Sequence, residues 1–204
     1  MFDKNLLLKL INDIEEEYLN FSEFFYETND DIDISKIKNL NTYSVGHAVK
    51  DDYFMEELIP KYHSNIEKFE VNSYFLEYHG KSKFRCRAKL LNSVYTKLEH
   101  YHYLERNKGA FYIRKSLNDM WGARIILKDL NNNIDGLKEM LDNLKYRNVI
   151  SRFYLKNKQG YKATHCYFQT NNRYFPWELQ IWDSLDEKNN VVSHIRHEKE
   201  KEKH

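Results

Sequence analysis

Four short patterns between residues 87 and 180 contain residue types that bind phosphates or move protons. The first is Arg87-x-Lys89-x-x-x-Ser93-x-x-x-Lys97. From Lys89 onward, the four-residue steps place two ammonium groups and a hydroxyl on one face of a predicted helix, with Arg87 just before it. Cations on one stripe suit a polyphosphate, although a solvated basic helix face would show the same pattern.

The second pattern is Asp119-x-x-Gly122-x-Arg124, which runs into the apolar segment Ala123–Leu127. A carboxylate at a strand edge is a common ligand of Mg²⁺, which takes one or two carboxylates together with substrate phosphates. Gly122 would allow a close approach to the backbone. Alone the pattern is weak, because an aspartate before a strand is often only a turn residue.

The third pattern is Gly160-Tyr161-x-x-x-His165, which follows a basic stretch containing Arg152 and Lys158. We expect a glycine-containing loop that presents the Tyr161 ring as a stacking platform for a base. The neighbouring cations would then lie near the phosphates of the same ligand.

The fourth pattern is Glu178-x-Gln180 on a predicted strand, with His194 sixteen residues after the glutamate. Strand alternation places Glu178 and Gln180 on one face, so that both can point into one cleft. Buried strands seldom carry two such polar side chains. Cys86 lies between basic residues but has no base–acid partner, so we assign no nucleophile.

Hydrophobic spacing predicts the elements that position these patterns. Helices are predicted over about residues 3–26, from about residue 52, over about 90–101 and over 134–144. Strands are predicted around 83–87 and over 123–127, 149–155, 163–170 and 174–182, with Asn171-Asn172 as a hairpin turn between the last two. We therefore expect an α+β fold, a mixed β-sheet flanked by helices.

Composition limits the class of protein. A chain of 204 residues with 41% hydrophobic side chains can bury a core, which excludes wholesale disorder. No apolar run approaches the length of a membrane span, and no secretory signal is recognisable. Cys86 and Cys166 are too few for a disulfide framework. We therefore expect a cytoplasmic protein with reduced thiols and no membrane partner.

The net charge of +1 hides a strong polarity along the chain. Residues 1–35 carry ten acidic and two basic side chains, a net −8, so residues 36–204 carry +9. The basic stretches 79–115 and 145–162 are also rich in aromatic residues, which favours phosphate-bearing ligands. The acidic N-terminal helix either braces the domain or lies near the basic stretches and competes with an anionic ligand.

In this order and at these spacings, the four patterns resemble the synthetase domain of the RelA/SpoT family, whose single-domain members are the small alarmone synthetases. The resemblance covers about residues 54–199 and begins with the segment 54–60. It implies a nucleotidyltransferase-like fold. Residues 1–50 would be an acidic helix and linker extension, residues 51–199 the synthetase domain, and residues 200–204 a charged tail.

The resemblance also implies a role for each residue of the patterns. ATP would be held at its adenine by Arg87 and Arg124, and at its triphosphate by Lys89, Ser93 and Lys97. Asp119 and Glu178 would hold Mg²⁺ as the cofactor, and the catalytic group would be Asp119, Glu178, Gln180 and His165, with Glu178 activating the attacking hydroxyl. The acceptor would be bound by Tyr161, Lys158, Arg152 and His194.

The implied reaction transfers the β,γ-pyrophosphate of ATP to a ribose 3′-hydroxyl, first of all that of GDP or GTP, which yields an alarmone. The alternative is a toxin of a toxin–antitoxin pair that modifies the 3′ CCA end of tRNA, with an antitoxin protein as partner. Family members usually have Arg-Thr where this chain has Trp182-Asp183. That departure and the positive charge of residues 36–204 favour tRNA, whereas Tyr161 fits both acceptors.

Overall fold

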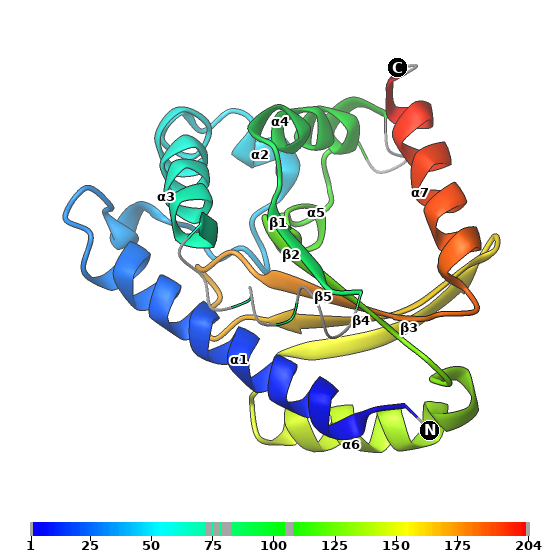
Figure 1. Cartoon of the computed structure of the whole chain (residues 1–204). Helices are drawn as coiled ribbons and strands as arrows, with labels where there is room; N and C mark the ends of the chain where they lie inside the picture. Colours follow the sequence, from blue (N-terminus) through cyan, green and yellow to red (C-terminus); the bar gives the residue numbers. More distant parts are fainter. Residues whose placement is uncertain (1, 72–74, 76–77, 79–82, 105–107, 203–204) are drawn as a thin grey trace.

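A mixed sheet of five strands organises the chain (Figure 1). The computed structural model describes residues 2–71, 75, 78, 83–104 and 108–202. The strands are β1 (Arg85–Ala88), β2 (Trp121–Leu127), β3 (Arg152–Lys158), β4 (Tyr161–Phe168) and β5 (Trp177–Asp183), in the spatial order β1-β2-β5-β4-β3. Strands β2 and β5 are parallel and the other neighbours are antiparallel. The expected α+β fold with a mixed sheet is confirmed.

Seven α-helices are present in the described part of the chain. They are α1 (Lys4–Ser22), α2 (Val45–Ala48), α3 (Ile59–Val71), α4 (Leu91–Glu99), α5 (Ile113–Ser116), α6 (Ile134–Tyr146) and α7 (Glu187–Glu202). Short π-helical segments continue α1 and α4 and precede α3, at Glu23–Glu27, His100–Leu104 and Tyr53–Leu58. Single 3₁₀ turns lie at Ile34–Lys36 and Asn131–Asn133. Pro60 lies inside the helix that the π-helical segment Tyr53–Leu58 opens and donates no N–H there; the Met55 carbonyl oxygen accepts from the Tyr95 hydroxyl at 3.0 Å.

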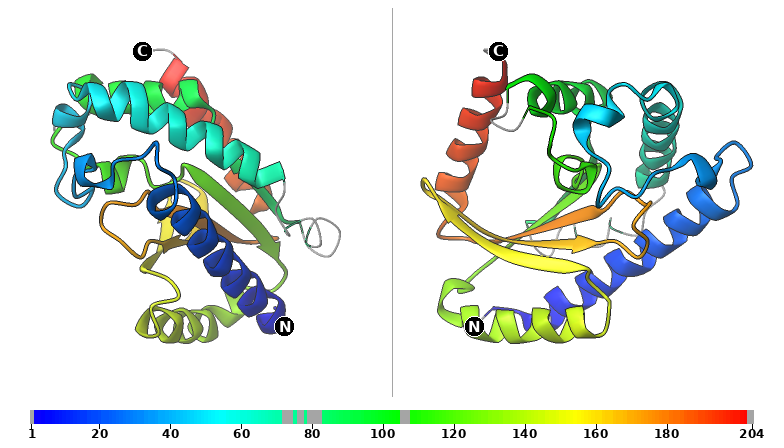
Figure 2. Two further views of the ribbon diagram at one scale, coloured as in Figure 1. Left: turned by 90° about the vertical axis from the view of Figure 1, so that its left-hand side faces the viewer. Right: turned by 180° about the vertical axis from the view of Figure 1, so that it is seen from behind.

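The helices divide between the two faces of the sheet. We call the face that carries Trp177 and Leu179 the core face, and the face that carries Glu178 and Gln180 the cavity face. Helices α1 and α6 lie on the core face, whereas α4 and α7 lie on the cavity face, as Figure 1 and the rear view of Figure 2 show. In the part of the chain that the structure describes, no helix is long and apolar enough to cross a membrane.

Helix α1 is part of the main hydrophobic core. An apolar stripe that continues into the π-helical segment Glu23–Glu27 is completely or almost completely buried: Leu7, Leu10, Ile11, Ile14, Tyr18, Phe21 and Phe25. The rings of Tyr18 and Phe21 lie 5.4 and 5.7 Å from that of Trp177 on the core face. One continuous core runs from Phe2 to Ile181, so residues 1–50 pack with the sheet. Helix α1 is therefore a structural support of the sheet, as the first of the two expectations for it proposed.

The predicted turn at Asn171-Asn172 is present, because the backbone N–H of Tyr174 donates to the carbonyl oxygen of Asn171 at 3.1 Å, but it lies in a longer loop than a tight hairpin. Residues 169–176 join the antiparallel strands β4 and β5, and the carbonyl oxygen of Asn172 accepts a hydrogen bond from the backbone N–H of Leu40, at 2.7 Å. The two-residue hairpin lies instead between β3 and β4, where Gln159 and Gly160 have φ of 54° and 80°. Two left-handed residues in succession match the twist of a tight hairpin. Tyr161 therefore begins strand β4 and does not lie on a loop.

Candidate active site

The register of the sheet gathers polar side chains on the cavity face. Glu178 pairs with Gly122 of β2 and with Tyr167 of β4, and Gln180 pairs with Arg124 and His165 in the same way. Strand β1 adds Arg87 opposite Gly122 and Arg85 opposite Arg124. Because directly paired residues share a face, residues from four strands point towards α4 and α7.

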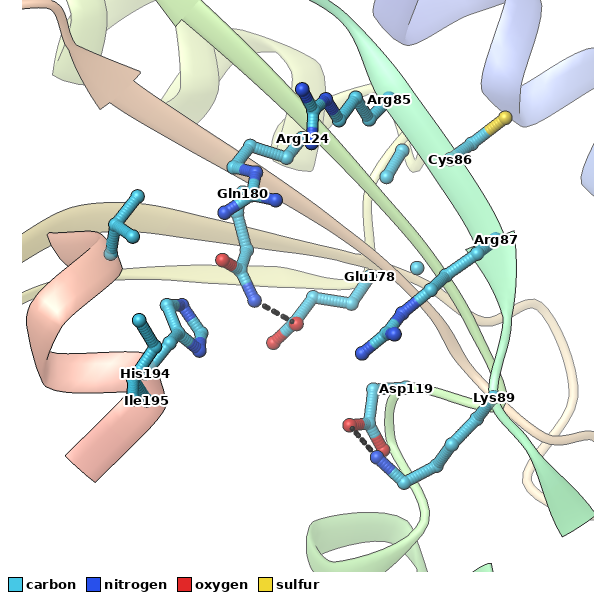
Figure 3. A pocket seen from close by; sticks show the side chains of 13 residues that line it. Arg85, Cys86, Arg87, Lys89, Asp119, Arg124, Glu178, Gln180, His194 and Ile195 are labelled. Atoms are coloured by element: carbon cyan, nitrogen blue, oxygen red, sulfur yellow. Dashed lines mark hydrogen bonds and ion pairs between the residues drawn. The ribbon is translucent and has the colours of Figure 1, made fainter. Parts of the chain in front are cut away.

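Apart from His165 and Tyr167, these residues line a cavity of about 440 Å³ (Figure 3). Seven of the residues predicted from the sequence line it: Arg87, Lys89, Asp119, Arg124, Glu178, Gln180 and His194. Arg85, Val191 and Ile195 also line it and were not singled out by the sequence analysis. A Cβ added at Gly122 would meet no atom within 4 Å. Gly122 thus leaves the space above its Cα open to the cavity.

Asp119 holds two lysines at one end of the cavity. The Nζ atom of Lys89 lies 2.9 Å from its Oδ2, and the Nζ atom of Lys97 lies 2.9 Å from its Oδ1. Burial raises the pKa of Asp119, but the charges of Lys97 and Lys89 outweigh it and hold the pKa below its ordinary value. The carboxylate therefore stays ionised. Helix α4 begins only at Leu91, so Lys89 precedes it, and Ser93 is exposed outside the cavity.

Glu178 accepts three hydrogen bonds from side chains. Its Oε1 accepts from His165 Nδ1 at 3.0 Å and from the Tyr167 hydroxyl at 2.6 Å, and its Oε2 accepts from Gln180 Nε2 at 2.8 Å. Burial alone would raise the pKa of Glu178. The hydrogen bond from His165 and the charge of His165 lower the pKa by more, so the net shift is downward. Two donors occupy Oε1 and one occupies Oε2. Oε2 therefore has one free lone pair, which can take a proton or a metal ion.

The two carboxylates fit a magnesium ion that is shared with a polyphosphate. Among the described residues, no group of three or more histidine, cysteine, aspartate and glutamate side chains could hold a metal ion. Asp119 is close enough to Glu178 to raise its pKa, and both line the cavity. Mg²⁺ is held by one or two carboxylates and completes its coordination with substrate phosphates and water. The donor set therefore suits Mg²⁺ bound together with a nucleotide.

Three arginines also line the cavity. The guanidinium carbon of Arg124 lies 4.2 Å from the centre of the Trp182 ring, and Trp182 stacks on His194 at 5.4 Å. Burial lowers the pKa of Arg124, and the charge of Arg85 adds to the effect. In the described part of the chain, Arg85 and Arg87 form no ion pair. These guanidinium planes are available to stack on a base or to bind an anion.

The predicted acceptor residues are arranged differently from the expectation. Tyr161 is buried rather than presented on a loop, because its ring packs edge-on against His194 of α7, at 5.4 Å. Its hydroxyl lies 3.1 Å from His165 Nε2 and donates to Gln180 Oε1 at 3.3 Å. Arg152 stacks over the Tyr167 ring at 4.1 Å, outside the cavity lining. Lys158 is exposed on the hairpin and does not line the cavity.

Tyr167 is a site residue that the sequence analysis missed. Its side chain is fully buried, yet its hydroxyl touches the carboxylate of Glu178. The sequence contains a signal for it, because Tyr167 lies two residues after His165 and must share its face of the strand.

Comparison with known proteins gives two results. A family model described as "Region found in RelA / SpoT proteins" matches residues 86–203, more than half of the chain. The crystal structure of small alarmone synthetase 2 from Bacillus subtilis matches with 18% identity over 73% of this chain and 82% of that one, with a TM-score of 0.36. Small alarmone synthetase 1 from the same organism matches with 18% identity over 71% and 78%, also with a TM-score of 0.36. No curated protein matches.

Proposed function

The chain belongs to the RelA/SpoT family, and we propose that it transfers the β,γ-pyrophosphate of ATP to the 3′-hydroxyl of a ribose. The observation that carries the proposal is the cavity in which Asp119 and Glu178 lie beside a group of lysines and arginines. Transfer of a phosphoryl-type group depends on positioning and charge neutralisation more than on a protein nucleophile. The cavity offers the residue types for both.

ATP would extend along the cavity, with its phosphates beside Asp119 and its adenine beside the arginines. Its adenine would stack between Arg87 and Arg124, which approach from neighbouring strands. Its phosphates would replace Asp119 as the partner of Lys89 and Lys97, which frees the Asp119 carboxylate. Mg²⁺, when bound by Asp119, would neutralise phosphate oxygens, which leaves the free lone pair of Glu178 Oε2 for a proton.

Glu178 would act as the base. The acceptor O3′ attacks the β-phosphorus of ATP, the bond from that phosphorus to the α–β bridging oxygen breaks, and AMP leaves. The proton of the 3′-hydroxyl passes to Glu178. We assign it to Oε2, because two donors already occupy Oε1. His165 and Gln180 hold the carboxylate in place from neighbouring strands.

We propose GDP or GTP as the acceptor, and the 3′ end of tRNA as the alternative. The alternative is favoured by the hairpin of β3 and β4, which carries the exposed Lys158 beyond the cavity. The segment 145–162 contains six basic residues and no acidic one. Such a surface suits the backbone of a nucleic acid. An antitoxin partner belongs to this alternative only.

The test follows the terminal phosphates of ATP. The protein is incubated with Mg²⁺ and ATP labelled in its γ-phosphate, together with GDP, GTP or deacylated tRNA, and the products are separated. We expect label on one of these acceptors and AMP in equal amount. Glu178→Gln should lower the rate by about 10²–10⁴-fold, whereas Glu139→Gln, an exposed carboxylate on α6, should leave it unchanged. Absence of labelled acceptor, or a fully active Glu178→Gln variant, would overturn the proposal.

A further inference from the structure

We propose that Tyr167 is a positioning residue that fixes the two carboxylates of the cavity relative to each other. The inference rests on the proposed function, because the carboxylates matter only if transfer takes place between them. Tyr167 lies on β4 directly opposite Glu178 of β5. Its hydroxyl is 2.6 Å from Glu178 Oε1, and its side chain is fully buried.

The hydrogen bonds of the Tyr167 hydroxyl have fixed directions. A carboxylate can only accept, so Tyr167 donates its one proton to Glu178. The Asn118 amide nitrogen can only donate, so Tyr167 accepts from it, at 3.2 Å. The Tyr154 hydroxyl, also at 3.2 Å, must therefore donate as well. The oxygen then uses both lone pairs and its proton, which leaves a single arrangement of this network.

This network joins the segments that carry the two carboxylates. Asn118 immediately precedes Asp119, and Tyr167 connects it to Glu178. Asp119 and Glu178 both line the cavity and carry like charges. They repel each other, so their separation must be set by contacts with the surrounding protein. The Asn118–Tyr167–Glu178 connection supplies such a contact.

The ring of Tyr167 also has close neighbours. The guanidinium carbon of Arg152 lies 4.1 Å from the ring centre. On the sheet, Tyr154 lies nearly parallel to it, with ring centres 6.0 Å apart. A fully buried phenol with these two neighbours can orient a carboxylate, because its ring has little room to move. This places Arg152 behind the catalytic carboxylate as a support.

The first test compares Tyr167→Phe with the wild-type protein in the transfer assay. Loss of the hydroxyl lets Glu178 rotate and separates the carboxylates. We expect kcat to fall about 10- to 100-fold, with KM for ATP within about twofold, since the groups assigned to ATP are untouched. The matched control is Tyr174→Phe, which removes a tyrosine–glutamate hydrogen bond of 2.9 Å to Glu27; neither of these residues lines the cavity. Its kcat should equal that of the wild-type protein.

The second test uses Asn118→Ala, alone and combined with Tyr167→Phe. If Asn118 acts through Tyr167, the single variant lowers kcat, and the double variant is no slower than Tyr167→Phe alone. If the Tyr167→Phe protein fails to fold in thermal unfolding, the kcat of Asn118→Ala decides the proposal. An unchanged kcat in either single variant, or losses that multiply in the double variant, would overturn it. A wild-type protein that transfers no pyrophosphate would overturn the proposed function and this inference with it.

Discussion

At the scale of single residues, Trp182 sets the plane of Arg124. The guanidinium lies 4.2 Å from the indole ring, which is fully buried and stacks on His194. A cation over a desolvated indole is worth about 0.5–2 kcal/mol. We expect Trp182→Leu to weaken ATP binding roughly three- to tenfold with a smaller change in kcat. Trp182→Phe should restore most of the affinity.

Calorimetric titration with a non-hydrolysable ATP analogue measures this affinity directly. The same titration of Arg124→Ala gives the loss expected when the stacked cation is removed altogether. Equal affinity for the analogue in the wild-type, Trp182→Leu and Arg124→Ala proteins would contradict the assignment of Arg124 to ATP.

The sequence predicts which side chains share a face wherever the type of element and its first residue are known, because each element has its own spacing. Glu178 and Gln180 lie two apart on one strand, and in the structure they are joined by a hydrogen bond. The prediction that Lys89, Ser93 and Lys97 share one helix face depended on where the helix begins. Because α4 begins after Lys89, the backbone turns there, and Ser93 does not join the two lysines at Asp119. Tyr167 was missed because an aromatic residue on a buried strand resembles ordinary core.

At the scale of elements, apolar stripes predicted the long helices and failed for α7. Its apolar residues Val191, Val192 and Ile195 are largely exposed, so the helix has no clear buried stripe in its sequence. The β4–β5 connection shows a different limit. The asparagines predicted its turn, but the loop around that turn contacts Leu40, which is remote in sequence. Only the folded chain contains that information.

One buried amide fastens α7 to the sheet. The Asn190 side chain is completely buried, accepts from the backbone N–H of Lys162 and donates to its carbonyl oxygen, each at 2.9 Å. We expect Asn190→Ala to lose about 1–3 kcal/mol and to loosen α7, which contributes His194, Val191 and Ile195 to the cavity. Amide hydrogen exchange in residues 187–196 should accelerate, and KM for ATP should rise several-fold.

The neighbouring Asn189 provides the control for this prediction. It lies on the same helix but is exposed. Asn189→Ala should leave both exchange and KM unchanged, because no contact with the sheet is lost. Exchange in α7 that is equally slow in both variants would contradict the role of the Asn190 clamp.

At the scale of the whole molecule, the sheet separates the residues of the hydrophobic core from the ionisable residues of the cavity. Its core face is covered by apolar side chains of α1 and its neighbours, whereas its cavity face carries the ionisable groups. A rigid, fully packed core face can hold polar residues of the other face at fixed spacing. The acidic N-terminal helix belongs to the first of these layers. Its packing favours a brace over a competitor for the anionic ligand.

The brace makes the stability of the whole chain depend on α1. Ile14 of this helix is completely buried, whereas Leu19 on the same helix is 43% exposed. We expect Ile14→Ala to lower the free energy of unfolding by about 2–4 kcal/mol, and Leu19→Ala by less than about 0.5 kcal/mol. Urea unfolding followed by tryptophan fluorescence and by circular dichroism should give one coincident transition, because α1 and the sheet share one core. A separate early transition for the helix signal, or a chain without residues 1–40 that folds and transfers pyrophosphate at the full rate, would show that α1 is an appendage rather than part of the fold.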